Sequence, residues 1–154
     1  GTGAVYHDNL GVFDSRDERV NPLFRFTTFL MRLRGRHACL RQAAWGDMAV
    51  GGDDVSYLFH APTADGSPNE GDRALAIHID APDDGFWVML NMTSDPVDFR
   101  VPEVDGDRAW RRLVDTAVGA EKEDNCWPEG EGEVVSDGVA VQPWSIVVWH
   151  RSPR

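Results

Sequence analysis

Alternating apolar and polar residues organise the chain around residues 74–92. Apolar residues stand at every second position from Leu75 to Ile79, which places them on one face of a β-strand. Residues 86–92 are almost wholly apolar, as in a central strand that is covered on both faces. Between these runs, residues 81–85 hold Pro, two Asp and Gly, which favour a reversal of direction. The pattern predicts a hairpin at the centre of a β-structure, with other segments covering its second strand.

A helical period precedes this β-region. Asn21 and Pro22 indicate a helix start, because Asn caps free N–H groups and Pro tolerates the first helical position. From Pro22 to about His37, apolar residues recur at spacings of three and four, which predicts a long amphipathic helix. Its expected buried stripe consists of Phe26, Phe29, Leu30, Leu33 and His37. Isolated helices of this length are marginal, so the helix needs a surface on which to dock.

From residue 40 onward, short β-like runs alternate with turn residues, which is typical of a sandwich or barrel. The candidate strands are residues 55–60, 75–80, 86–92, 97–101, 108–114, 132–135, 139–141 and 145–151. Asp137-Gly138 predicts a tight hairpin between the sixth and seventh runs, because both residue types tolerate positive φ. Residues 61–72 and 117–133 are polar and rich in Gly and Pro, so we expect them to be surface loops.

These patterns predict a mainly β fold: an antiparallel β-sandwich of about seven or eight strands, preceded by one long amphipathic α-helix. We expect three regions, namely an irregular arm over residues 1–20, the helix over residues 21–40 and the sandwich over residues 41–154. A chain of 154 residues is long enough to bury one core.

Composition excludes several partners. The 26 acidic and 15 basic residues give a formal net charge of −11, which works against binding a polyanion, so nucleic acid is not an expected partner. No apolar run approaches the roughly 20 residues of a membrane helix, and we expect no membrane partner. Cys39 and Cys126 are far apart in sequence and are predicted to be free thiols. No secretory signal opens the sequence, which favours a cytoplasmic location.

Candidate chemistry is sparse. Neither Ser nor Cys stands in a G-x-S-x-G elbow, and no ligand spacing indicates a bound metal, so we expect no catalytic residue, no metal and no cofactor. The candidates for a sugar contact are three tryptophans in or beside loops, whose ring faces would stack on a sugar ring: Trp45, Trp127 and Trp144. The more ordinary alternative is that these rings close the edges of the core.

One segment resembles a known family. Residues 86–117 read FWVMLNMTSDPVDFRVPEVDGDRAWRRLVDTA: an apolar strand ending in Asn, a turn, a short strand leading to Pro, and a Trp strand ending in Asp-Thr. The residues in those places are Asn91, Phe99, Pro102, Trp110, Asp115 and Thr116. In this order they resemble the C-terminal β-domain of isoamylase-type glycogen debranching enzymes of the α-amylase superfamily, glycoside hydrolase family 13. Residues 23–41 look like the last barrel helix of those enzymes, and residues 141–149 look like their closing strand.

The arm shows a further likeness and a departure. Residues 5–9 are similar to the family's stretch after its last catalytic residue, but Leu10 stands where those enzymes have Glu. The family hydrolyses α-1,6 branch linkages with an Asp nucleophile, a Glu acid–base and a second Asp on barrel strands, and all three would precede Gly1. The resemblance therefore implies a chain that is not catalytic by itself.

The function implied by this resemblance is support of the catalytic barrel, the partner in the same polypeptide, together with a place beside the glucan groove. An independent carbohydrate-binding sandwich that takes α-glucan is the alternative, and a structural domain without ligand is a third class. The helix face that the barrel would cover is expected to be an apolar patch through which the chain self-associates, unless residues 5–13 fold over it.

Overall fold

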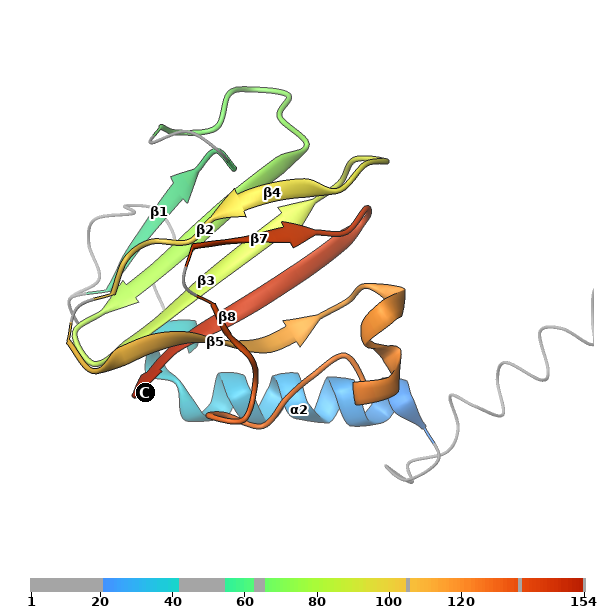
Figure 1. Cartoon of the computed structure of the whole chain (residues 1–154). Coiled ribbons are helices and arrows are strands. Elements are labelled where there is room, and N and C mark those ends of the chain that lie inside the picture. Colours follow the sequence, from blue (N-terminus) through green and yellow to red (C-terminus); the bar gives the residue numbers. More distant parts are fainter. Residues whose placement is uncertain (1–20, 42–54, 63–65, 105, 136, 154) are drawn as a thin grey trace, which may run out of the picture. The chain divides into compact units, whose positions relative to one another are not determined.

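The computed structural model describes residues 21–41, 55–62, 66–104, 106–135 and 137–153 (Figure 1). The chain divides into two compact units, Gly1–Arg36 and His37–Arg154. Helix α2 lies in the first unit, and all the strands of the described ranges lie in the second. Within those ranges, no helix has the length and apolar character that crossing a membrane requires.

Helix α2 (Pro22–Arg36) begins where the sequence predicts. The Oδ1 atom of Asn21 accepts a hydrogen bond from the backbone N–H of Phe24 at 3.0 Å, which satisfies one of the free donors of the first turn. Pro22 follows as the first helical residue, where its missing N–H costs nothing. The predicted cap and helix are therefore confirmed.

The apolar side of α2 differs from the predicted stripe. Leu33 is buried as expected, but Leu30 is 37% exposed, so its assignment to the buried stripe is wrong. Leu23 and Met31 are 50% and 71% exposed. Because these three exposed residues are spaced at i, i+7 and i+8, they share one side of the helix. We call Leu23, Leu30 and Met31 the exposed apolar face of α2.

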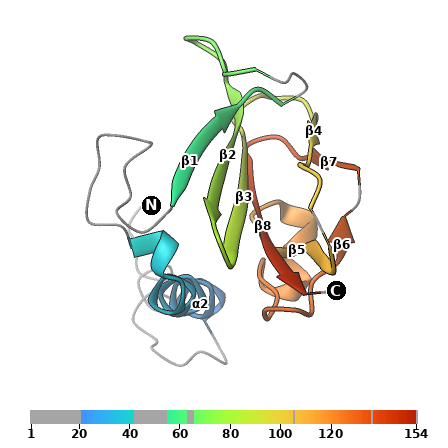
Figure 2. The same ribbon diagram turned by 90° about the vertical axis from the view of Figure 1, so that its left-hand side faces the viewer.

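Six strands form one antiparallel sheet in the order β1-β2-β3-β8-β5-β6 (Figure 2). Their bounds are β1 (Ser56–His60), β2 (Ala74–Ala81), β3 (Asp84–Asn91), β5 (Arg108–Asp115), β6 (Val134–Val135) and β8 (Ser145–Pro153). The almost wholly apolar strand β3 lies between β2 and β8, which confirms its predicted central place.

A second antiparallel sheet consists of β4 (Val97–Arg100) and β7 (Gly138–Val141), and it packs on one face of the larger sheet (Figure 1). The core between the sheets is formed by Ala76, Trp87, Met89, Phe99, Val101, Trp110, Val141, Val147 and Trp149. Eight antiparallel strands in two sheets, preceded by a helix, confirm the predicted fold class.

The central hairpin also has its predicted turn. Ala81 pairs with Asp84, which leaves two residues to connect β2 and β3. Arg151 of β8 donates from Nη1 to Asp80 Oδ1 at 2.7 Å and so holds the hairpin end. A Cβ atom on Gly85 would lie 3.1 Å from the guanidinium Cζ of Arg151, so this close approach favours glycine.

The hairpin predicted at Asp137-Gly138 is wrong. Strand β6 pairs with β5 of the large sheet, whereas β7 pairs with β4 of the small one. Gly138 lies at the start of β7 rather than in a hairpin turn. A Cβ atom at this position would lie 2.9 Å from the carbonyl oxygen of Phe99. The glycine therefore permits close backbone approach within the small sheet rather than positive φ in a turn.

Residues 117–133 are more ordered than the predicted surface loop. They contain the 3₁₀-helix η2 (Val118–Glu123), in which Ala120 is buried. Cys126 forms an isolated β-bridge with Val114 of β5, and it is a free thiol as predicted.

Asn91 joins the two sheets at the end of β3. Its fully buried side chain donates from Nδ2 to the carbonyl oxygens of Asp95 and Val141, at 2.8 and 2.9 Å. Its Oδ1 accepts from the backbone N–H and the hydroxyl of Thr93, at 2.9 and 2.7 Å. The single side-chain amide of Asn91 therefore forms hydrogen bonds with the turn that follows β3 and with the end of β7.

We expect Asn91→Ala to lower the free energy of unfolding by about 2–4 kcal/mol, because it leaves buried carbonyl and N–H groups without partners. Urea unfolding measures the change. Asn69→Ala is the control, since the side chain of Asn69 is exposed, and it should shift stability by less than about 0.5 kcal/mol. Equal effects of the two substitutions would show that Asn91 is not the tie between the sheets.

Candidate functional site

Two places in the sandwich unit gather chemically useful side chains: a cavity beside Trp144 and a polar cluster around Asp84. The first involves a residue that the sequence analysis names as a candidate sugar contact, whereas the second contains no residue named there as a candidate for a site.

The predicted tryptophans lie in different surroundings. Trp45 is outside the described residues. Trp127 is half-buried, and the guanidinium carbon of Arg112 lies 5.3 Å from its ring centroid. The same guanidinium lies 5.5 Å from the ring centroid of Trp149 in the core. A cation–π contact therefore already occupies Trp127.

Trp144, in contrast, is 64% exposed in the turn between β7 and β8. Its φ of 55° lies in the left-handed region, which a bulky residue rarely adopts because its Cβ crowds the backbone. An indole in this position costs free energy that a glycine would not.

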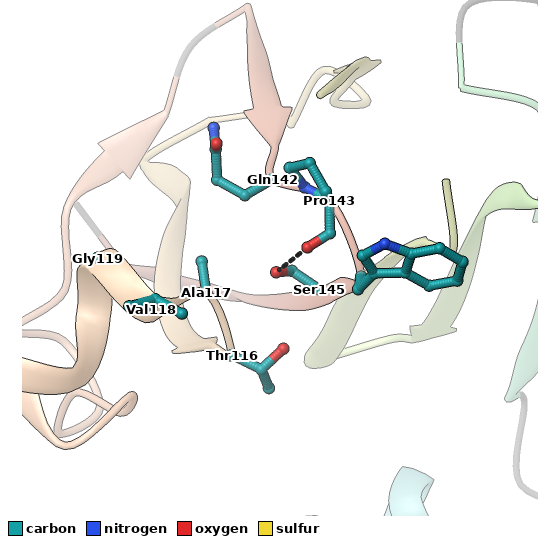
Figure 3. A pocket seen from close by; sticks show the side chains of 8 residues that line it. Thr116, Ala117, Val118, Gly119, Gln142, Pro143 and Ser145 are labelled. Carbon is teal, nitrogen blue, oxygen red and sulfur yellow. Dashed lines mark hydrogen bonds between the residues drawn. The ribbon is translucent and has the colours of Figure 1, made fainter. Parts of the chain in front are cut away.

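A cavity of about 430 Å³ adjoins this residue, and its lining is formed by residues 116–119 and 142–145 (Figure 3). Small-ligand sites commonly occupy about 300–1,000 Å³. Thr116 Oγ1 accepts a hydrogen bond from the backbone N–H of Ile146 at 2.8 Å, and a hydroxyl in that role keeps its own proton to donate. The amide of Gln142 belongs to an exposed residue of the same lining. The lining of the cavity thus includes one aromatic residue, Trp144, together with polar residues.

The second place is a polar cluster that brings together distant residues. His37 Nδ1 lies 2.7 Å from Asp84 Oδ2, and His150 Nε2 lies 2.9 Å from Asp84 Oδ1. The thiol of Cys39 donates to Asp84 Oδ2 at 3.3 Å. The second ring nitrogen of His37, Nε2, lies 3.2 Å from Glu129 Oε2. We call these five residues the Asp84 cluster.

Each member is positioned by a different segment. His37 and Cys39 stand at the start of the sandwich unit, where Cys39 belongs to the 3₁₀-helix η1 (Ala38–Arg41) and its carbonyl oxygen accepts from the Tyr57 hydroxyl at 2.6 Å. Asp84 begins β3, and His150 lies in β8. The rings of both histidines pack on Phe86, each with a centroid separation of 4.9 Å.

The electrostatics of the cluster favour an ionised Asp84. Burial alone would raise the pKa of this carboxyl, but hydrogen bonds from His150, His37 and Cys39 outweigh it and hold the pKa well below its usual range. Burial raises the pKa of the Cys39 thiol to about 12, and the hydrogen bond to Asp84 and its negative charge act in the same direction. At neutral pH the cluster therefore pairs a carboxylate with a neutral thiol.

The sequence analysis missed this cluster because its members do not share a motif. Asp84 is 47 positions from His37 and 66 from His150. One available signal is His150, a polar residue that directly follows the apolar run of residues 146–149 in the strand that closes the sandwich. A buried histidine needs a polar partner, but the pattern does not say which one.

Eight antiparallel strands in two sheets define the second unit as a β-sandwich domain. Residues 60–145, more than half of the chain, match the family described as isoamylase, C-terminal. The chain belongs to this family and thus carries the C-terminal domain of an isoamylase-type enzyme, which confirms the resemblance seen in the sequence. A search of curated proteins finds no match to the chain.

The residues that carry the resemblance stabilise the sandwich. Besides Asn91, Trp110 is buried and donates from Nε1 to the carbonyl oxygen of Pro102 at 2.8 Å. Phe99 is buried in the core. Asp115 Oδ1 accepts from the backbone N–H of Ala117 at 2.9 Å. Most of the family pattern therefore marks the fold, and Thr116, which lines the cavity beside Trp144, is the exception.

We expect substitution of two adjacent acids, Asp84 and Asp83, to change the free energy of unfolding by very different amounts. Asp84→Asn removes the charge that three donors share, and we expect the free energy of unfolding to fall by about 2–3 kcal/mol. The matched control is Asp83→Asn, because Asp83 is 96% exposed and pairs only at the surface with Arg108. That variant should change stability by less than about 0.5 kcal/mol.

Urea unfolding in a buffer with chelator measures the change in stability caused by each of the two substitutions. If Asp84→Asn were as mild as Asp83→Asn, the cluster would contribute little to the stability of the domain.

Proposed function

We propose that this chain supports the catalytic barrel of a glycogen debranching enzyme that hydrolyses α-1,6 branch linkages in α-glucan. The family match supports the enzyme type, because an isoamylase C-terminal domain implies a catalytic domain in the same polypeptide. In this proposal α2 is the last helix of that barrel, and the sandwich is the domain attached to it.

The exposed apolar face of α2 is the observation that carries the proposal. Leu23, Leu30 and Met31 leave apolar surface in water on one side of a 15-residue helix. Such clustered apolar surface marks an interaction site, and short helices gain most of their stability from packing. A barrel layer supplies a fitting apolar partner, whereas self-association through this face is the alternative that an isolated chain would show.

Mixing the chain with an isoamylase-type enzyme that lacks its C-terminal region tests this role. We expect association by sedimentation and a gain in the thermal stability and α-1,6 hydrolysis of the truncated enzyme. Met31→Asp should weaken association by about tenfold or more, because it places a charge in an apolar contact. Val134→Asp is the control, since Val134 is 48% exposed in β6 and lies outside α2.

Two results would contradict the supporting role. Release of reducing ends by the chain alone would make it an enzyme in its own right. Association that is indifferent to Met31→Asp would show that the exposed apolar face is not the contact.

The cavity beside Trp144 favours a second candidate function, the binding of α-glucan by the sandwich itself. An exposed indole offers a flat apolar face to a sugar ring, and the neighbouring hydroxyl and amide groups suit sugar hydroxyls. The left-handed φ of Trp144 adds weight, because strained residues that persist cluster at functional sites. The same surface would border the glucan groove in the complete enzyme.

Trp144→Gly separates binding from stability. We expect calorimetry with a branched maltodextrin to show at least about a tenfold loss of affinity, as for a removed aromatic anchor. Stability should stay equal or rise by up to about 1 kcal/mol, because glycine relieves the left-handed strain. Trp127→Ala is the comparison, and it should keep glucan affinity while losing stability through its contact with Arg112. Affinity that survives Trp144→Gly would exclude this cavity as the glucan site.

A further inference from the structure

Three potential metal-ligand atoms converge in the Asp84 cluster, and a fourth, the sulfur of Cys39, lies beside one of them. The ligand atoms of His37, Asp84 and His150 all lie within 4.8 Å of one another. The sulfur of Cys39 lies 3.3 Å from Asp84 Oδ2. We propose that His37, Cys39, Asp84 and His150 form a structural binding site for a divalent ion of the zinc type, which fastens residues 37–39 to the sheet.

The separations between Asp84 and its three partners are close to those around a tetrahedral ion. Zinc bonds of about 2.0–2.3 Å place neighbouring ligand atoms roughly 3.3–3.7 Å apart. The sulfur to carboxylate distance of 3.3 Å already falls there. The two histidine nitrogens lie 2.7 and 2.9 Å from the carboxylate oxygens, so a separation of roughly 0.5–1 Å would admit the ion.

The donor types point to the same class of ion. Two imidazole nitrogens, one carboxylate oxygen and the thiolate of Cys39, whose proton is released to solvent when the ion binds, make a mixed set that zinc takes, whereas calcium and magnesium prefer oxygen alone. Four protein ligands leave no open position, which is the hallmark of a structural zinc site rather than a catalytic one. Cys39 is 2% exposed, and the side chains of both histidines are 11% exposed, so the site is shielded from water.

Glu129 provides an independent sign of a metal site. Its Oε2 lies 3.2 Å from His37 Nε2, the ring nitrogen that faces away from Asp84. Metal-binding histidines commonly donate their other N–H to a carboxylate, which fixes the tautomer and turns the free lone pair toward the ion. The hydrogen bond from Tyr57 to the carbonyl oxygen of Cys39 holds the ligand segment from the other side. Both ligands of this segment, His37 and Cys39, are therefore held in place by hydrogen bonds to neighbouring residues.

A bound ion would also explain why the cluster lies where it does. It would fasten the start of the sandwich unit to β3 and β8, which already pair with each other at Phe86 and His150. The rival explanation is a metal-free hydrogen-bond network made by the same atoms. The two explanations differ in whether a cation replaces the protons between Asp84 and its partners.

Cobalt titration of the full 154-residue chain, without a histidine tag and after removal of metals by chelator, distinguishes them. We expect stoichiometric Co²⁺ binding with the visible bands of four-coordinate cobalt and a thiolate-to-cobalt charge-transfer band. Zn²⁺ should displace the cobalt and raise the Tm. Cys39→Ser should abolish the charge-transfer band, whereas Cys126→Ser, at the other free thiol, should retain it. Glu129→Gln should weaken cobalt binding about 10- to 100-fold.

Two results would overturn the proposal. One is a chain that circular dichroism shows to be folded but that does not bind Co²⁺ or Zn²⁺ stoichiometrically. The other is a charge-transfer band that survives Cys39→Ser or disappears with Cys126→Ser. Either result would leave the cluster as a hydrogen-bond network only. Because wild-type protein gives the primary readout, the test does not depend on the folding of any variant.

Discussion

The sandwich depends on covering strand β3 from both sides. On one face, Trp87 and Met89 pack in the core beneath the small sheet. On the other face, Phe86 is fully buried and contacts the rings of His37 and His150. Each large apolar side chain contributes about 1.5–3 kcal/mol only when it leaves water. Both the β4–β7 sheet and the segment at His37 are therefore needed for this strand to be stable.

Polar side chains hold β3 at its two ends. Asn91 connects its last residue with the turn that follows and with the end of β7. Asp84 connects its first residue with His37, Cys39 and β8. A slip of one residue would turn every side chain of the strand to the opposite face and remove both ends from their partners. The apolar strand supplies the driving force, and its polar ends select one register.

The family residues and the surfaces proposed for function are largely separate. Asn91, Phe99 and Trp110 serve the internal bonds and core of the sandwich. The exposed apolar face of α2, the cavity beside Trp144 and the Asp84 cluster depend mainly on other residues. This separation is physically reasonable, because a fold is maintained by buried contacts while its uses are set by the groups at its surface and in its sites. Family membership therefore identifies the domain, and the individual sites require their own tests.

The sequence by itself determined the helix, the eight strand segments and the class of fold. These features are encoded within a few residues of one another, by a cap at Asn21, by alternation in β2 and by the apolar run of β3. The tertiary structure alone decided that β6 and β7 belong to different sheets and that Gly138 serves a close approach to Phe99. It also decided that His37, Asp84 and His150 meet. The local pattern does not specify such pairings, because they depend on contacts between strands that are far apart in sequence. They also depend on how the whole chain packs around a common core.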